Sequence, residues 1–196
     1  YAVEKAMALG ARVVTVSDSS GTVIDEDGFT PEKLAILMEV KNHLYGRVGD
    51  YAARTGSRFE AGVRPWHVPV DVALPCATQN ELDANDAATL IKNGVLCVAE
   101  GANMPSTIEA AKAFEAAGVL YAPGKASNAG GVATSGLEMS QNAERISWPG
   151  AEVDARLLQI MQGIHAACLK YGARADGSVS YVDGANVAGF VKVADA

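Results

Sequence analysis

The sequence predicts an α/β fold, a doubly wound, Rossmann-like parallel sheet with a helical section at its C-terminal end. Two patterns predict it. Through the first 130 residues, short apolar runs alternate with segments of helical character, and in the last third helices follow one another without strands between them. We therefore expect a division into residues 1–130, which hold the sheet, and residues 131–196, whose helices pack back on it.

The predicted strands are four short runs that are apolar on both faces, a pattern typical of strands buried in a parallel sheet. They lie at residues 12–16, 70–74, 95–99 and 119–121. The first is rich in β-branched residues, and the other three end near Pro75, Gly101 and Pro123. Because proline and glycine mark turns, we expect a loop after each of these three strands.

Helix start and stop signals lie between and after these runs. Thr30 and Pro31 begin a helix that continues to Lys41, with Thr30 as N-cap and Pro31 in the first turn. Asn128 and Asp183 are the expected caps of two later helices. We predict further helices over residues 1–9, 83–94 (with Asp83 or Asn85 at its start), 106–118, 129–145, 153–171 and 183–196. The first has no capped start and the last still has helical composition where it stops, so we expect a chain truncated at both ends.

Composition and charge argue against several classes of function. A net charge of −7 and a pI of about 4.9 do not suit a protein whose main task is nucleic-acid binding. No apolar run approaches the ~18–20 residues of a membrane-spanning helix. The three cysteines form no CxxC pair and the three histidines show no metal spacing, so we expect no metal site and a reducing compartment.

Ligands of open α/β sheets bind at the carboxyl ends of the strands, so the loops there hold the candidate site residues. Asp18 and Ser19 follow the first predicted strand. An aspartate at this point can accept a hydrogen bond from a ribose 2′-hydroxyl, whereas the small hydroxyl residues beside it can donate to a 2′-phosphate. A plain polar turn is the alternative. The glycine-rich phosphate loop that should precede this strand would lie upstream of residue 1.

Small and amide residues follow the next two strands. Ala77, Thr78 and Gln79 come after the second strand, and Gly101 and Asn103 come after the third. Amides and backbone groups suit a ribose or a carboxamide, which need neutral donors and acceptors. Each loop is a weak signal alone, and an ordinary loop is its alternative. Two such loops at successive strand ends reinforce each other.

The segment around Asn128 is the densest signal. Gly130 and Gly131 follow it and allow a close approach to the backbone, and Ser135 lies just inside the helix. A helix start of this kind can face a carboxylate or a nicotinamide. A glycine-softened helix start without a ligand is the alternative.

Five motifs together resemble the hexameric glutamate dehydrogenases of bacteria and fungi. They are VVTVSDSSGTVIDEDGFT, DVALPCATQNELD, VAEGANMPST, APGKASNAGGVATSGLEMSQNAERISW and DGANVAGFVKVADA. The resemblance covers the whole chain in order. It implies a cytoplasmic homo-hexamer that reversibly converts L-glutamate, water and NADP to 2-oxoglutarate, ammonia and NADPH. It also implies that the catalytic lysines and aspartate lie on an N-terminal domain, so this chain would supply the coenzyme-binding part and no catalytic residue.

The resemblance also implies roles for individual residues. Asp18 and Ser19 would lie at the adenosine ribose, and Lys41 at the 2′-phosphate of NADP(H). Some NADP enzymes have an arginine where this chain has Leu44, so NAD(H) stays possible unless Arg47 compensates. The remaining implied contacts are Ala77, Thr78 and Gln79 along the coenzyme, Gly101 and Asn103 at the nicotinamide ribose, Asn128 at the carboxamide, and Val132 and Ser135 in the glutamate pocket.

Two other functions stay open on the sequence alone. One is a sister dehydrogenase that acts on leucine, phenylalanine or valine, whose side-chain pockets are apolar; Ser135 favours glutamate instead. The other is a non-catalytic subunit that only binds a nucleotide. The dehydrogenase interpretation predicts that Asp18, Thr78, Asn103 and Asn128 border one crevice.

Overall fold

The computed structural model describes all residues, Tyr1–Ala196, and they form two compact units. Unit 1 is Tyr1–His67 and unit 2 is Val68–Ala196. The division expected at residue 130 stays a prediction about how the complete protein is organised. None of the helices combines the length with the apolar character that crossing a bilayer requires.

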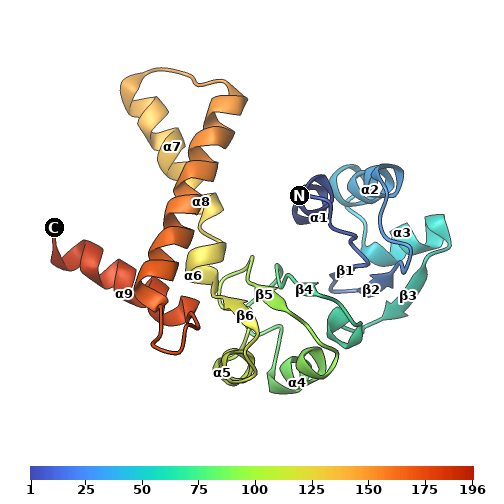
Figure 1. The fold of residues 1–196 in the computed structure, drawn as a ribbon. Coiled ribbons are helices and arrows are strands. Elements are labelled where there is room, and N and C mark those ends of the chain that lie inside the picture. Colours follow the sequence, from blue (N-terminus) through green and yellow to red (C-terminus); the bar gives the residue numbers. More distant parts are fainter. The chain divides into compact units, whose positions relative to one another are not determined.

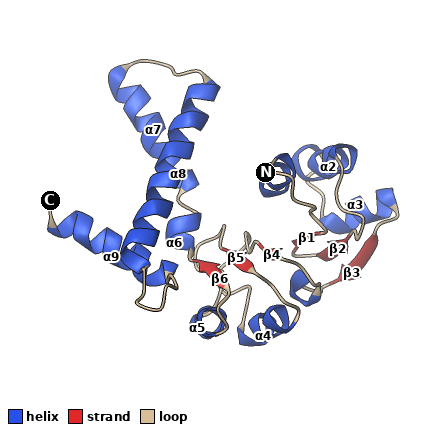
Figure 2. Cartoon of the chain, in the orientation of Figure 1, coloured by secondary structure: helices blue, strands red, loops and turns tan.

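Unit 1 contains an antiparallel sheet of three short strands in the order β1-β2-β3 (Figures 1 and 2). They are β1 (Thr15–Asp18), β2 (Gly21–Ile24) and β3 (Arg58–Ala61). The parallel strand predicted at residues 12–16 is therefore wrong in this chain, since its observed counterpart starts at Thr15 and pairs antiparallel with β2. The physical reason is local, because Ser19 and Ser20 form a two-residue turn and such turns join antiparallel neighbours.

The helices of unit 1 pack on this sheet around an apolar core. They are α1 (Ala2–Ala8), α2 (Pro31–Met38), η1 (Glu39–His43), α3 (Val48–Thr55) and the short η2 (Pro65–His67). Thr30 caps α2 as predicted, accepting a hydrogen bond from the Lys33 N–H at 3.3 Å. The core includes Val23, Leu37 and Tyr51, all at most 7% exposed.

The helix that begins at Pro31 does not stay α-helical as far as Lys41. It changes at Glu39 into a π-helical turn, in which Leu44 N–H bonds to the Glu39 carbonyl. A π-turn fits one additional residue into the helix and redirects the side chains that follow. Lys41 lies inside this turn, and its direction depends on the turn.

Unit 2 contains the parallel sheet that the sequence predicts. Its strands are β4 (Val72–Ala73), β5 (Cys97–Ala99) and β6 (Leu120–Ala122), in the order β4-β5-β6. The connecting helices α4 (Ala84–Lys92) and α5 (Ile108–Ala116) lie side by side below the sheet in Figure 1. Asp83 caps α4 and Thr107 caps α5, so both predicted helix starts are confirmed.

The two faces of this parallel sheet differ in burial. Phe114 of α5 stacks on Tyr121 of β6 with ring centroids 5.8 Å apart, and Val98, which lies beside Tyr121 in β5, is fully buried. On the opposite face Val72 is 52% and Leu120 is 61% exposed. The expectation that these strands are buried on both faces is therefore wrong within this unit, because α4 and α5 cover the same side.

The C-terminal helical section follows β6 as predicted. It consists of α6 (Gly124–Ser127), α7 (Gly130–Glu144), α8 (Gly150–Gly172) and α9 (Tyr181–Ala194). Figure 1 shows α7 and α8 as a hairpin, with α9 packed across the lower end of α8. Two predicted caps are wrong, because Asn128 ends α6 rather than beginning α7, and Ser180 rather than Asp183 caps α9. Ala129 occupies the N-cap position of α7, and Ser180 occupies that of α9.

Candidate functional site

A pocket of about 630 Å³ lies at the carboxyl ends of the unit 2 strands. The loops after β4 and β5 meet the end of α6 and the start of α7 there. Its lining residues are Cys76, Ala77, Gln79, Gly101, Ala102, Asn103, Asn128 and Val132. Six predicted site residues are therefore brought together. Thr78 belongs to the same loop but does not line the pocket, and Ser135 is an exposed residue further along α7.

Backbone contacts hold the β4 and β5 loops against each other. The Pro75 carbonyl accepts hydrogen bonds from Gly101 N–H at 2.9 Å and from Ala102 N–H at 3.3 Å. A Cβ at Gly101 would lie 2.5 Å from the Cys76 Sγ, so the Cys76 side chain would have to turn aside to admit any larger residue. Burial raises the pKa of the Cys76 thiol, and the charge of Glu81 adds to this effect. A hydrogen bond from Gly101 N–H lowers the pKa but does not cancel the rise. Cys76 is therefore a protonated wall residue near neutral pH.

Two asparagine side chains form the polar part of the pocket. Asn128 Nδ2 donates to the Ala102 carbonyl at 2.9 Å and to Asn103 Oδ1 at 2.7 Å. The carbonyl can only accept, so it fixes the orientation of the Asn128 amide. The arrangement leaves Asn128 Oδ1 as an acceptor and Asn103 Nδ2 as a donor for a ligand.

Glu100 fixes the frame beneath this pair although sequence reasoning did not name it as a site residue. It is 3% exposed at the end of β5. Its Oε1 accepts from Tyr121 OH at 2.6 Å and from Ser106 N–H at 3.2 Å, and its Oε2 accepts from Gly124 N–H at 2.6 Å. A buried carboxylate needs such donors to replace the water it loses. The available signal was an acidic residue between an apolar strand and a glycine.

The predicted adenosine-end residues lie in unit 1 and centre on Asp18. Its Oδ1 accepts from the Ser20 N–H at 2.9 Å and the Ser20 hydroxyl at 2.7 Å. Its Oδ2 accepts from Lys41 Nζ at 2.8 Å and from Val48 N–H at 3.0 Å. Burial raises the pKa of Asp18, but the hydrogen bonds from Lys41, Ser20 and Val48 outweigh it and lower the pKa to about 2. Asp18 is therefore ionised at neutral pH.

The residues around this ion pair are open to solvent. Ser19 is an exposed turn residue, so the polar-turn alternative describes its local structure correctly without deciding its role. Lys41 keeps 34% of its side chain exposed, and Arg47 is exposed at the start of α3. Leu44, at the position where some NADP enzymes have arginine, is 60% exposed.

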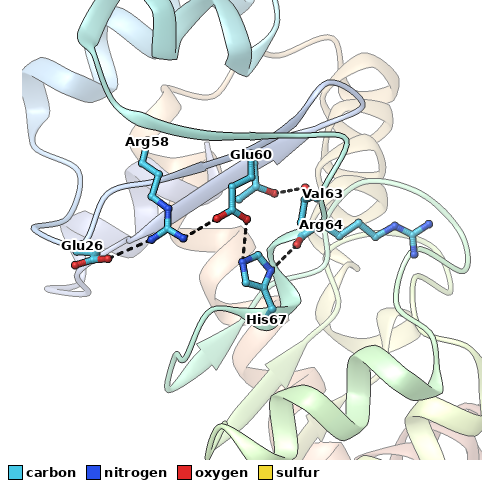
Figure 3. A network of polar contacts seen from close by, with 7 residues as sticks. Glu26, Arg58, Glu60, Val63, Arg64 and His67 are labelled. Carbon is cyan, nitrogen blue, oxygen red and sulfur yellow. Dashed lines mark hydrogen bonds and ion pairs between the residues drawn. The ribbon is translucent and has the colours of Figure 1, made fainter.

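A second polar cluster of unit 1 joins β3 to the turn that follows it (Figure 3). Arg58 bonds to Glu60 at 2.7 Å and lies 3.5 Å from Glu26, while His67 Nε2 lies 3.0 Å from Glu60. The Arg58 and Glu26 side chains are 58% and 84% exposed. Exposed ion pairs contribute little to stability, so we assign this cluster to fixing the chain after β3.

The sequence profile of the family described as Glutamate/Leucine/Phenylalanine/Valine dehydrogenase matches residues 1–196. The chain belongs to this family. A pocket at the carboxyl ends of a parallel sheet is where an open α/β domain binds its ligand.

Three glutamate dehydrogenases are similar to this chain over its whole length. The NADP-specific glutamate dehydrogenase of Salmonella typhi is 67% identical, over 100% of this chain and 44% of its own length. An NAD(P)-specific glutamate dehydrogenase of Xylanibacter ruminicola is 57% identical with the same coverage. The crystal structure of Plasmodium falciparum glutamate dehydrogenase matches with a TM-score of 0.93 at 44% identity, covering 100% of this chain and 42% of that one.

These matches confirm the resemblance to glutamate dehydrogenases and the α/β fold with C-terminal helices. This dehydrogenase family member spans less than half the length of each of the three relatives. Sequence reasoning missed Cys76 and Ala102 as pocket residues as well as Glu100. Ala102 has no functional side chain and the Cys76 thiol has no CxxC partner, so the small and amide residues beside them were the signal that marked the two loops as candidates.

Proposed function

We propose that the protein is an NADP-dependent glutamate dehydrogenase that interconverts L-glutamate with 2-oxoglutarate and ammonia. This chain would supply the coenzyme-binding part, with the catalytic lysines and aspartate outside it. The 67% identity with the NADP-specific glutamate dehydrogenase of Salmonella typhi supports this proposal. The complete enzyme would be a cytoplasmic homo-hexamer, as in the family that the motifs resemble.

The observation that carries the proposal is the amide pair in the unit 2 pocket. A nicotinamide carboxamide offers one acceptor and two N–H donors, and the Asn128 Oδ1 and Asn103 Nδ2 atoms complement such a group and its ribose. Ala77, Gln79 and Gly101 would line the path of the coenzyme, and Thr78 would contact it from the same loop. The coenzyme carries the hydride chemistry when bound, and these residues orient it.

The Asp18–Lys41 ion pair supports NADP over NAD. A carboxylate offers about four lone-pair sites, and Asp18 already accepts four hydrogen bonds. It has little capacity left for the ribose 2′-hydroxyl of NAD. Lys41 gives only one of its three N–H donors to Asp18, so the other two can bind a 2′-phosphate, with Ser19 donating from the turn.

The start of α7 would form the substrate end of the site. Val132 lines the pocket, and Ser135 follows on the same helix. The N-terminus of a helix favours negative charge, and a serine hydroxyl there can donate to the side-chain carboxylate of glutamate. We propose that closure of the cleft between domains excludes water during hydride transfer.

Titration of the complete protein with NADPH and NADH tests the coenzyme assignment. We expect NADPH to bind at least about tenfold more tightly, because charge-assisted phosphate contacts add to its affinity. In the same protein, L-glutamate should be oxidised faster than leucine, phenylalanine or valine. Equal affinity for the two coenzymes would refute the NADP assignment, and faster oxidation of an apolar amino acid would refute the glutamate assignment.

A further inference from the structure

Glu100 bonds to three segments around the pocket through its side chain and its own carbonyl. Its carboxylate accepts from Ser106 before α5, from Tyr121 in β6 and from Gly124 at the start of α6. Its backbone carbonyl accepts from the Ser127 hydroxyl at 2.6 Å. A buried carboxylate whose two oxygens both accept hydrogen bonds rigidifies the segments that donate to it.

Every partner of the carboxylate acts as a donor. Backbone N–H groups can only donate. Burial, and then the hydrogen bond to Glu100, raise the pKa of the Tyr121 hydroxyl, so it also keeps its proton. The position of Glu100 therefore favours a side chain with two acceptor oxygens.

Glu100 is connected to both members of the amide pair through the segments that carry them. Gly101 to Asn103 follow Glu100 directly in the chain, and Asn128 ends the short helix α6 whose first N–H bonds to Glu100 Oε2. A Cβ on Gly124 would lie 2.6 Å from the Ala102 carbonyl, which shows how closely the two segments pack. We propose that Glu100 is a positioning residue that sets the Asn103–Asn128 pair for the nicotinamide end of the coenzyme. This inference rests on the proposed function.

The substitution Glu100→Gln tests the inference because it keeps the size and removes one acceptor. If the glutamine oxygen faces Ser106 and Tyr121, its NH₂ group opposes the Gly124 N–H. If the amide is turned over, the NH₂ group opposes the Ser106 N–H. One backbone donor therefore loses its acceptor in either orientation, and the frame under the amide pair must shift.

The measurement compares two ligands in the complete protein. NADPH carries both a nicotinamide and a 2′-phosphorylated adenosine, whereas adenosine 2′,5′-bisphosphate carries only the adenosine group, whose binding we assign to Asp18, Ser19 and Lys41. We expect Glu100→Gln to weaken NADPH binding about tenfold and to leave the bisphosphate unchanged, since an unpaired buried donor costs about that much affinity. Unchanged NADPH binding, or an equal loss for both ligands, would overturn the inference.

Two further variants complete the test. Glu115→Gln makes the same chemical change in unit 2 at a carboxylate that accepts from Ser180 at 2.8 Å, away from the pocket, and should leave both affinities unchanged. A loss of NADPH affinity in Glu115→Gln as large as that in Glu100→Gln would count against a local effect.

If Glu100→Gln does not fold, Tyr121→Phe replaces it, because it removes one donor and leaves the carboxylate in place. We expect an NADPH-selective loss of about threefold from this single hydrogen bond, and no loss would overturn the inference. Failure of the wild-type protein to bind NADPH would instead reject the proposed function itself.

Discussion

At the scale of single residues, the ion pair with Asp18 holds the Lys41 ammonium group that we propose for the coenzyme site. Both groups are mostly buried, with side-chain exposures of 14% and 34%, and the other Asp18 donors hold the carboxylate in place. The lysine is therefore positioned before a ligand arrives, which reduces the ordering cost of binding. A neutral side chain in place of Lys41 would remove the positive charge beside Asp18.

We predict that Lys41→Gln lowers the ratio of NADPH to NADH affinity at least about tenfold, because it removes a charge-assisted contact to the 2′-phosphate. Coenzyme fluorescence titration measures the ratio. The matched control is Lys33→Gln, which breaks the similar Lys33–Asp25 pair of 2.6 Å with side-chain exposures of 33% and 10%. A fall of the ratio in the control equal to that in Lys41→Gln would contradict the prediction.

Sequence patterns identified residues whose partners are close in the chain. Thr30 and Asp83 cap helices through donors two or three positions away, so local sequence was sufficient. Glu100 bonds to residues 6, 21 and 24 positions away, and the fold alone brings them together. For the same reason the contact between Asp18 and Lys41, 23 positions apart, could be expected from the family resemblance but not from spacing.

At the scale of elements, segments with clear periodicity and caps were predicted and the short mixed ones were missed. The parallel strands β5 and β6 and the helices α4, α5, α7 and α8 lie close to their expected positions. The missed elements are β2, β3, α3 and the short helices η2 and α6. β3 has the sequence Arg-Phe-Glu-Ala, and its strand conformation depends on pairing with β2 rather than on apolar alternation.

The crossing of α8 and α9 depends on glycine. A Cβ on Gly184 would collide with the backbone carbonyl of Cys168, and backbone cannot move aside cheaply. We predict that Gly184→Ala destabilises the protein by about 1–3 kcal/mol, as overpacking does. Urea unfolding of the complete protein measures the change.

The control for this crossing lies on the same helix. Gly189 has open space around its Cβ position, so Gly189→Ala should be neutral or stabilise by up to about 1 kcal/mol through helix propensity. If Gly184→Ala proved as harmless as Gly189→Ala, the two helices would not pack as closely as described.

At the scale of the whole molecule, the chain has two cores. Leu37, 7% exposed, belongs to the core of unit 1, whereas Leu90, 1% exposed, is buried in unit 2. The sequence indicated one sheet-containing domain up to residue 130, because apolar alternation does not reveal which strands pair. The antiparallel hairpin of unit 1 depends on the two-residue turn between β1 and β2, and the periodicity of the strands does not reveal this turn.

We predict that the two cores open separately. Leu37→Ala should cost about 2–5 kcal/mol locally and raise amide hydrogen exchange in Tyr1–His67, with little change in Val68–Ala196. Leu90→Ala is the reciprocal variant and should show the opposite pattern. Mass-spectrometric hydrogen exchange follows both, and a uniform rise along the chain in either variant would contradict two separate cores.

The π-helical turn Glu39–His43 has a consequence for how coenzyme choice is encoded. An α-helical residue turns the helix by about 100°, so deleting one residue before Lys41 would restore regular winding and swing the ammonium group away from Asp18. Under the proposed function, the number of residues in the turn Glu39–His43 would determine the preference for NADP(H) over NAD(H) as strictly as the charge of Lys41 does. Coenzyme preference could then change through the loss of a single codon, with every charged residue still present.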